Sequence, residues 1–504
     1  MPLAPVAPAK TSSKPASPLG FSHWMERVIH EWQRAGSDLA ADPVHDLRVA
    51  LRRCRSMADG LYAISSEKSF KDMKKAGKRI FSALGELRDV QVMTEWVEKL
   101  GPKDDPETKA LLDELLKRET EKKASAGDAM RSFDVRQWRK WSKELPRKSA
   151  RIKRGSIAFK HLALERWTEA YALHRRAMHN RSQVALHSLR IGIKRFRYIV
   201  ENFLPQQHEA WGSDLKELQD LLGDVHDLDV LWTAATQINA FANEESRARW
   251  QQIVREARDK RIARYRERML GPASLWRVWR KELPAGEQIE VAAMARLRLW
   301  ASFLDPDFAH SQRVAALSAQ LYEGLERNGL NPQSEHDARK ILLAAALTHD
   351  VGRAKRDRAH HKVSYRWIQE MTPPLGWSVA DLHLAGVVAR FHRGALPQAR
   401  HKALRGLATA DRRLAVYLAG VLRLAVALDG RRDGPVDRLE VAAKDGCLEM
   451  SVAGYAPWTA TAADVAAARH VLEVVLRRPI LIKPMRVARA RASGPRLVAR
   501  TQVA

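Results

Sequence analysis

The sequence predicts an all-α protein: two similar helical bundles, then a second helical domain that ends in a small β-hairpin and a helix. The first observation is a repeat, because VHDLRVALRRCRSM at 44–57 returns 142 positions later as LHSLRIGIKRFRYI at 186–199. The second is the spacing of apolar residues at i, i+3, i+4 and i+7 along most of the chain, with few β-branched runs. The repeat predicts two related bundles, and the spacing predicts helices throughout both of them.

Each copy of the repeat places a histidine and then basic residues three, seven and ten positions later. These four positions fall within about 80° of one helical face, and the opposite face is apolar. A row of fixed cations suits a long polyanion with regularly spaced charge better than a single small anion. The rows consist of His45, Arg48, Arg52 and Arg55 in the first copy, and of His187, Arg190, Lys194 and Arg197 in the second.

A second helix is repeated as well, because KRIFSALGELRDVQVM at 78–93 matches KELQDLLGDVHDLDVL at 216–231. Both copies contain the pattern LG-x-x-x-D, and Lys78 in the first corresponds to Lys216 in the second. Lys74 is expected on the same helical face as Lys78. A single basic row is typical of a solvated helix surface. Two helices repeated in the same order favour a pseudo-symmetric binding site instead.

These two helix pairs resemble the conserved histidine α-helical (CHAD) domain, over roughly residues 20–285. The resemblance implies two similar bundles around a basic channel that binds inorganic polyphosphate. His226 stands where the first copy has Arg88, which implies weaker anion binding by the second half at neutral pH. The ligand contacts that the resemblance implies are His45, Arg48, Arg52, Arg55, Lys74, Lys78, His187, Arg190, Lys194, Arg197 and Lys216.

Composition limits the class of protein and of partner. The formal net charge is +28 with a pI near 10.3, which favours an acidic partner. The two cysteines, Cys54 and Cys447, lie far apart, which excludes a disulfide scaffold and fits a reducing cytoplasm. The most apolar segment, 414–429, is too short for a bilayer and contains Arg423. We expect a soluble cytoplasmic protein without a membrane partner, located at polyphosphate granules if the channel binds that polymer.

Turn and breaker residues predict the domain boundaries. Residues 1–20 are expected to form a disordered leader, and the repeat region 21–285 comprises copies at about 21–140 and 155–285. The second domain is expected at 286–482, followed by a disordered basic tail at 483–504. Within it, alternation over 436–453 around Asp445-Gly446 predicts a β-hairpin, and a last helix is expected at 462–477.

Four residues of the second domain have the chemistry of a metal site: His310, the adjacent pair His349 and Asp350, and Asp429. Imidazole and carboxylate groups hold divalent metals and leave positions open for water and phosphate oxygens. Adjacent side chains on a helix point about 100° apart. The His-Asp pair can therefore share one metal only at a helix end, and Val351-Gly352 is a plausible helix stop.

The surrounding segment AALTHDVGRAKRDRAHHKVSYRWI, with GVVARFHRG and LRLAVALDGRRDGPVDRLEV, resembles the C-terminal HD domain of the exopolyphosphatase/guanosine pentaphosphate phosphatase family, over about residues 290–480. The resemblance implies that His310, His349, Asp350 and Asp429 ligate a divalent ion (Mn, Fe, Ni, Zn or Mg). His361 and His392 would complete a second metal position. The competing interpretation is that these two contact phosphate or the domain surface.

Two further features leave alternatives open. A basic cluster either clamps phosphate or forms a solvated loop; it consists of Arg353, Lys355, Arg356, Arg358 and Lys362. Val363 stands where relatives usually have the second histidine of H-K-H-S, so one imidazole is lost. The sequence has no phosphate-binding glycine loop and lacks the actin-like nucleotide-binding domain that precedes this region in the family. Any hydrolysis must therefore occur at the HD site itself.

The first functional hypothesis is a polyphosphate-binding domain fused to a metal-dependent phosphohydrolase. Metal-activated water would attack phosphorus, with His349 and Asp350 as the catalytic pair and Asp350 as the residue that orients the water. The substrate would be polyphosphate or a nucleotide such as (p)ppGpp. The second hypothesis is a binding protein whose HD domain serves as scaffold or nucleotide sensor. Nucleic-acid binding is disfavoured, because Tyr198 is the only aromatic residue on the basic faces.

Overall fold

The computed structural model describes residues 20–36, 41–102, 104–180, 182–238, 240–432 and 436–485. The predicted leader, except Gly20, and all of the predicted tail after residue 485 lie outside the described residues. The chain folds into two compact units, residues 1–300 and 301–504. Helix α12 (Glu287–Leu304) contains the point of division.

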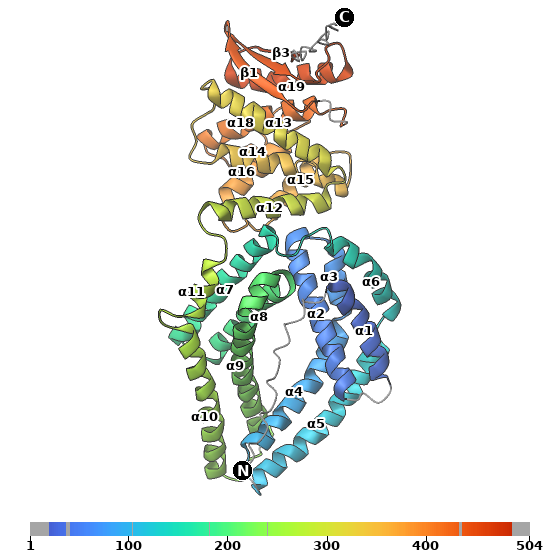
Figure 1. Cartoon of the computed structure of the whole chain (residues 1–504), viewed down its shortest axis with the longest axis vertical. Helices are drawn as coiled ribbons and strands as arrows, with labels where there is room; N and C mark the ends of the chain where they lie inside the picture. The colour runs from blue at the N-terminus through green and yellow to red at the C-terminus, as the bar shows by residue number, and fades with distance from the viewer. Residues whose placement is uncertain are drawn as a thin grey trace, which may run out of the picture. The chain divides into compact units, whose positions relative to one another are not determined.

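The first unit is helical along both halves of the repeat (Figure 1). The first half contains α1 (Phe21–Ala35), α2 (Ala41–Ser65), α3 (Lys68–Ala76), α4 (Lys78–Leu100), α5 (Pro106–Arg131) and α6 (Val135–Ser149). The second half contains α7 (Ile157–Asn180), α8 (Gln183–Phe203), α9 (Pro205–Gln237), α10 (Glu244–Met269) and α11 (Leu275–Lys281). The repeated histidine helices are α2 and α8, and the LG-x-x-x-D helices are α4 and α9.

Local sequence explains where several of these helices begin. Asp105 accepts a hydrogen bond from the Thr108 amide just before Pro106, so both an acidic cap and a first-turn proline start α5. Asn243 and Ser246 form a reciprocal capping box at the start of α10. These caps satisfy amide groups that have no partner within the helix.

The two halves differ at one break. The segment that corresponds to the single long helix α9 is divided in the first half at Gly77 into α3 and α4. Lys74 is therefore on α3 and Lys78 on α4, so the expectation that both lysines lie on the face of one helix is wrong. Gly77 packs closely here, because a Cβ atom on it would lie 3.3 Å from the ring of Trp138.

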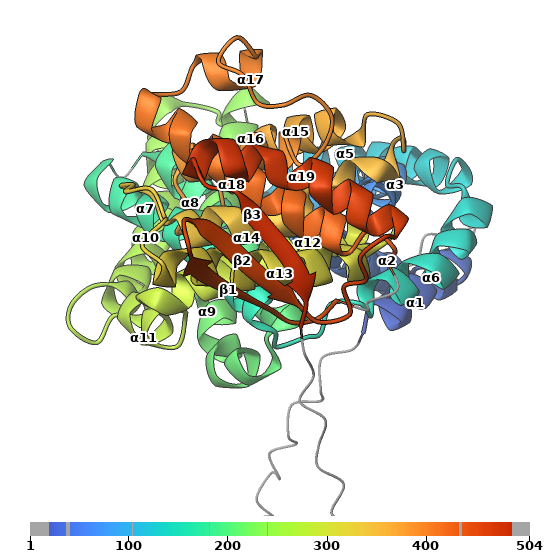
Figure 2. The same cartoon turned by 90° about the horizontal axis from the view of Figure 1, so that it is seen from above.

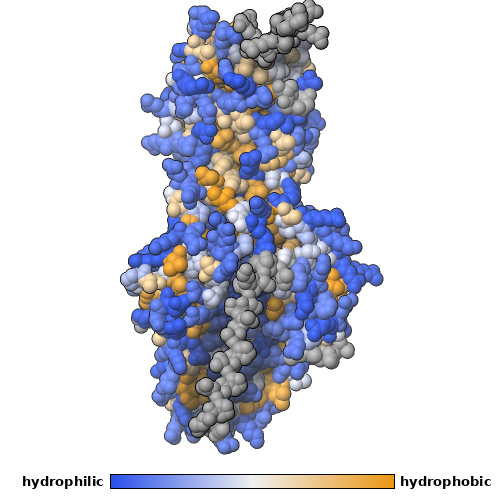
Figure 3. Space-filling model, in the orientation of Figure 1, coloured by the Kyte–Doolittle hydropathy of each residue, from blue (hydrophilic) through white to orange (hydrophobic). Residues whose placement is uncertain are grey.

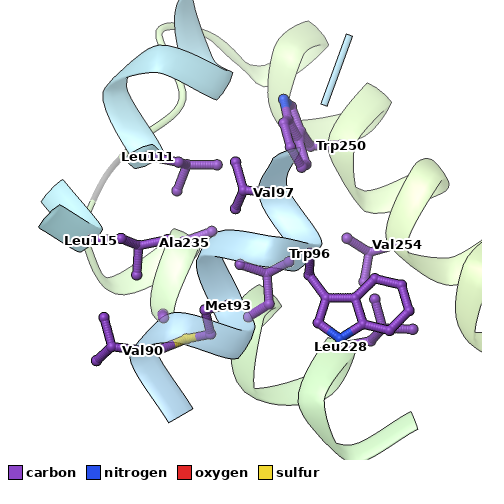
Figure 4. Close-up of a cluster of buried hydrophobic side chains, with 12 residues drawn as sticks. Val90, Met93, Trp96, Val97, Leu111, Leu115, Leu228, Ala235, Trp250 and Val254 are labelled. Carbon is purple, nitrogen blue, oxygen red and sulfur yellow. The ribbon is translucent and has the colours of Figure 1, made fainter. Parts of the chain in front are cut away.

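One hydrophobic core joins the two halves. It is formed by α4 and α5 of the first half and by α9 and α10 of the second (Figure 4). Trp96 and Trp250 are its largest side chains, and both are at least nine-tenths buried. The Trp250 Nε1 donates a hydrogen bond to the Asp105 carboxylate at 3.1 Å, which adds a polar link between the halves. The repeat copies therefore fold as one unit.

The second unit is a helical domain with a small sheet (Figure 2). Its elements after α12 are α13 (Phe308–Arg327), α14 (Ala338–Thr348), the 3₁₀ turn η1 (Val351–Ala354), α15 (His360–Gln369), α16 (Val379–Arg390), α17 (Lys402–Arg405), α18 (Thr409–Leu428), β1 (Leu439–Lys444), β2 (Cys447–Val452), α19 (Ala460–Leu476) and β3 (Ile480–Pro484). Helix α18 has a largely buried face and packs against α13, α14, α16 and α19.

The predicted hairpin is confirmed, and one strand was missed. β1 and β2 pair antiparallel, with Leu439 opposite Val452. Asp445 and Gly446 both have positive φ, as a two-residue hairpin turn requires. The missed strand β3 pairs parallel with β2, and α19 supplies the crossover connection between them. Only Ile480 of β3 is buried, so its sequence carries little strand signal.

The predicted all-α class is confirmed, since helices form most of the described chain and its sheet has three short strands. Within the same described ranges, no helix is long and apolar enough to cross a membrane.

Candidate functional site

The two histidine helices of the repeat pack directly on each other. A Cβ atom on Gly60 of α2 would lie 2.3 Å from the ring of Phe203 in α8, so only glycine permits this approach. Beside it, the buried Asn202 side chain donates a hydrogen bond to the Ser56 hydroxyl at 3.1 Å. This contact brings the cationic faces of both helices to the same part of the unit.

The basic rows of the two halves converge near Lys194. Burial, and then the charges of Arg190, Arg52, Arg48 and Arg55, lower the pKa of Lys194 to about 8. Three of these four arginines belong to α2, the other copy of the repeat. The surface is hollowed between the two halves, and the walls of this central hollow are hydrophilic (Figure 3). Cations from both rows therefore lie within electrostatic reach of one another around Lys194.

The other predicted contact residues differ in their exposure and in whether they already pair with a carboxylate. His45, Lys78, His187 and Lys216 are exposed. The ammonium of Lys74 pairs with Asp59, and Arg55 donates to the Lys74 carbonyl oxygen at 2.6 Å. Arg197 lies 3.6 Å from the buried carboxylate of Glu201, which also pairs with Arg53 at 2.5 Å. Lys74 is therefore already paired with a carboxylate, whereas Arg197 shares the single negative charge of Glu201 with Arg53.

The aspartates of the two LG-x-x-x-D patterns lie among these cations. Burial raises the pKa of Asp227 to about 6, although Arg190 and Arg48 oppose the shift, and Asp89 adds to it. Arg48 and Arg190 act on Asp89 in the same way. The sequence did not predict acidic groups within the basic site. Burial and Arg190 also lower the pKa of His226 to about 4, so this histidine adds no charge at neutral pH.

In the second unit, the His-Asp pair stands at a helix end, as the spacing predicts. Helix α14 ends at Thr348, and η1 follows directly after Asp350. A Cβ atom on Gly352 would lie 2.3 Å from the His360 carbonyl oxygen, so this glycine is required for close packing against α15. The Ser364 hydroxyl donates to the His349 carbonyl at 2.7 Å and accepts from the Gly352 amide at 2.9 Å. The turn is thereby fixed to α15.

Three buried imidazoles are oriented in the same way. The Nδ1 atoms of His349, His360 and His392 each lie 2.7 Å from the backbone carbonyl oxygen three residues earlier. Because a carbonyl oxygen only accepts, each Nδ1 carries the proton and each Nε2 presents its lone pair. Burial keeps the pKa of His392 well below its ordinary value, which favours the neutral form that metals bind.

The Nε2 atoms gather around Asp350 in two groups that could hold a metal ion. One group consists of His310, His349 and Asp350, and the other of Asp350, His360 and His392. The ligand atoms within each group lie within 4.8 Å of one another. The buried Nε2 atoms of His310 and His349 have no hydrogen-bond partner among the described residues. Such atoms fit a divalent ion, because burying them without a partner is otherwise unfavourable.

Two predicted ligands are placed differently from the expectation. The second group contains His360, whereas the neighbouring His361 is half-buried and stays outside it. Asp429 lies outside both groups, and its carboxylate accepts hydrogen bonds from His310 Nδ1 at 2.6 Å and from Arg313 at 2.9 Å. Asp429 is therefore arranged to orient His310.

The two carboxylate oxygens of Asp350 have different neighbours. Oδ1 faces the imidazoles, 2.9 Å from the Nε2 of His360 and 3.6 Å from that of His349. Oδ2 accepts from Arg432 at 3.1 Å and from Arg353 at 3.3 Å. Burial by itself would raise the pKa of Asp350, but the neighbouring imidazoles, His349 first among them, hold that pKa below its ordinary value. Asp350 is thus ionised at neutral pH.

A cavity of about 360 Å³ opens onto these groups. Its wall includes His310, His349, Asp350, His360, His392, Arg393, Gly394, Arg423, Val426, Ala427, Gly430, Arg432, Asp464, Ala467 and Ala468. Arg353 is the member of the predicted basic cluster that contacts Asp350, whereas Lys355, Arg356, Arg358 and Lys362 are exposed. Arg393, Arg423 and Arg432 of this wall are not among the site residues that the sequence predicts. The available signal was that Arg393 directly follows His392, that Arg432 follows Asp429 by three residues, and that Arg423 is on the last turns of α18.

Two family models match the chain, one in each unit. Residues 23–236 match the CHAD domain, and residues 298–463 match domain III of the Ppx/GppA phosphatase. No curated protein matches the chain. The pair of domains supports a function related to polyphosphate. Together with the converging cation rows and the histidine–aspartate cluster, these matches identify the chain as a CHAD domain fused to a Ppx/GppA phosphatase domain III.

Proposed function

We propose that the first unit binds inorganic polyphosphate and that the second is a metal-dependent HD-type phosphohydrolase acting on polyphosphate or on phosphorylated nucleotides such as (p)ppGpp. The observation that carries the catalytic part is the common orientation of His349, His360 and His392. Each donates its Nδ1 proton to a backbone carbonyl at 2.7 Å and directs its Nε2 toward Asp350. Three buried imidazoles fixed this way around one carboxylate are typical of a metal centre.

The binding part is supported by the concentration of cations where α2 meets α8. Burial is the main cause of the lowered pKa of Lys194 there, and repulsion by Arg190 and by the arginines of α2 adds to it. A linear polyanion would relieve this repulsion and release its condensed counterions. We therefore expect tight binding that weakens steeply with salt. Duplex DNA of equal phosphate content should compete poorly, because its phosphates lie on a wide and stiff duplex.

In the second unit, His310, His349 and Asp350 would hold one divalent ion, and Asp350, His360 and His392 a second. A bound ion supplies Lewis acidity, which activates water and polarises phosphoryl oxygens. Arg353 and Arg432 hold the second oxygen of Asp350, so that its first oxygen stays directed at the imidazoles. Arg432 also lines the cavity, where its remaining N–H groups can bind phosphoryl oxygens.

The test is metal analysis of the purified full chain, combined with phosphate release from long-chain polyphosphate and from a nucleotide panel. We expect bound manganese, iron, nickel or zinc, and activity that a chelator removes and the metal restores. The matched variant is His349→Ala, which should lose both metal and activity. A metal-free protein that releases no phosphate from any substrate would contradict the catalytic proposal.

One observation favours a second candidate, a polyphosphate-binding protein located at cytoplasmic granules whose HD domain is a scaffold or nucleotide sensor. Val363 is 4 % exposed at the position where the family's H-K-H-S pattern has a second histidine. A valine there removes one potential ligand. Because this position is buried, water cannot take the place of the missing imidazole. Nucleotide binding without phosphate release would select this candidate.

A further inference from the structure

Two glycines occupy equivalent positions in the interior of the LG-x-x-x-D helices. Gly85 is in α4 (Lys78–Leu100) and Gly223 is in α9 (Pro205–Gln237). Glycine in a helix interior destabilises the helix relative to alanine, because it loses more backbone freedom on folding. Its presence in both copies therefore requires a structural or functional reason at each site.

Neither of the usual structural reasons applies. A Cβ atom on Gly85 or Gly223 would meet no heavy atom within 4 Å, and neither residue has a left-handed φ. The histidine helices behave differently: Gly60 faces Phe203 at 2.3 Å and Gly192 faces Leu173 at 2.8 Å. Packing thus explains Gly60 of α2 and Gly192 of α8, whereas Gly85 of α4 and Gly223 of α9 border open space.

This open space belongs to the cationic site. Lys78 precedes Gly85 by seven residues and Asp89 follows it by four, so all three share one face of α4. Lys216, Gly223 and Asp227 repeat this arrangement on α9. Both aspartates lie within electrostatic reach of Arg48 and Arg190, which belong to the basic rows of α2 and α8. The bare faces of α4 and α9 are therefore turned toward those rows.

We infer that Gly85 and Gly223 keep the backbone of α4 and α9 bare so that a phosphate chain can lie directly against both helices. A side chain at either position would push the chain outward and lengthen its contacts with Arg48, Arg190 and the lysines of the same faces. Because Coulomb attraction falls with distance, each lengthened contact would weaken. This inference rests on the proposed polyphosphate binding by the first unit.

The experiment measures stability and affinity together, because the two should change in opposite directions. Full-length variants Gly85→Ala, Gly223→Ala and the double variant would be titrated with long-chain polyphosphate at fixed salt and melted without ligand. Alanine should leave the melting temperature equal or higher, since it favours the helix. Each single change should weaken binding about threefold to tenfold, and the double change should multiply the losses, as for independent sites.

The matched control is Gly406→Ala in the second unit. Gly406 also has an ordinary φ and no heavy atom near its Cβ position, so the same change there should leave polyphosphate affinity unchanged. The larger variants Gly85→Leu and Gly223→Leu should weaken binding more than alanine does. Unchanged affinity in both alanine variants would overturn the inference, and so would a lower melting temperature, which would assign the glycines to packing. A wild-type chain that binds no polyphosphate would instead overturn the proposed function, and this inference with it.

Discussion

The Nδ1 atom of His310 lies 2.6 Å from the Oδ2 atom of Asp429, although 119 residues separate them in the chain. The carboxylate fixes the imidazole with its Nε2 directed at His349 and Asp350, and Arg313 donates to both oxygens of this carboxylate. Asp429, expected from the sequence to be a direct metal ligand, is arranged here to act through His310. Such partners of metal-binding histidines contribute to affinity without touching the metal.

Asp429→Asn should lower the affinity for Mn²⁺ about 10- to 100-fold, because the amide is a weaker acceptor and no longer fixes His310. The measurement is titration of the chelator-treated full chain with Mn²⁺ by calorimetry. Asp437→Asn is the control, since Asp437 is exposed and lies outside both groups of possible ligands. An asparagine variant with wild-type affinity would mean that Asp429 has no part in the metal site.

Asp350→Ala should remove bound metal and any phosphohydrolase activity, because both candidate metal groups contain this carboxylate. Polyphosphate affinity should remain, since the cation rows belong to the other unit. Metal content by mass spectrometry and polyphosphate titration of the same sample test both parts. Retained metal in this variant would exclude the proposed centre.

The neighbouring histidines of α15 give a sharper comparison. His360→Ala should reduce metal content and activity as strongly as His392→Ala, because both imidazoles face Asp350. His361→Ala should reduce metal content and activity less, although it removes the same atoms from the adjacent residue. If His361→Ala is the more damaging change, the grouping of His360 with Asp350 is wrong.

Charge reversal should show that both halves of the CHAD domain bind one ligand. Arg52→Glu and Lys194→Glu should each weaken polyphosphate binding, and the double change should nearly abolish it. Helical circular dichroism should be unchanged, because both side chains project away from the apolar faces. Arg400→Glu, an exposed position of the second unit, is the charge-matched control. Loss of helical signal in either single variant would assign these residues to packing.

Polyphosphate affinity should fall as the pH rises through about 8. Burial and the surrounding arginines lower the pKa of Lys194 to about 8 in the free protein. A bound polyanion favours the charged lysine and raises this pKa, so binding takes up a proton. Affinity is therefore full below this pH and decreases above it, by at most about tenfold per pH unit for one proton. Titrations at pH 7, 8 and 9 at constant ionic strength measure the slope.

Lys194→Arg is the control for this pH dependence. Arginine stays charged from pH 7 to 9, so the part of the pH dependence of affinity that comes from Lys194 should disappear. Asp227, whose pKa burial raises to about 6, should change the polyphosphate affinity at lower pH than Lys194 does. Its protonation removes a negative charge beside the ligand, so affinity should rise as the pH falls through about 6. If an Asp227→Asn variant shows the same rise in polyphosphate affinity, that rise is due to another titrating group.

The local elements follow from local chemistry, which is why the sequence predicted them. The spacing of His187, Arg190, Lys194 and Arg197 fixes one helical face whatever that helix packs against. The turn at Asp445 and Gly446 likewise needs only two residues that accept positive φ. The repeat predicted two related halves for the same reason, because similar local patterns form similar elements.

The sequence by itself determined the all-α class, the two cation rows and the placement of the His349-Asp350 pair at a helix end. Only the tertiary structure decided which faces meet. Adjacent helical residues point about 100° apart, so only one of His360 and His361 can face Asp350, and the start of α15 makes it His360. The approach of α2 to α8 at Gly60 and the reach of Arg432 to Asp350 depend on contacts between distant segments. Periodicity fixes the face of a helix, whereas long-range packing chooses its partner.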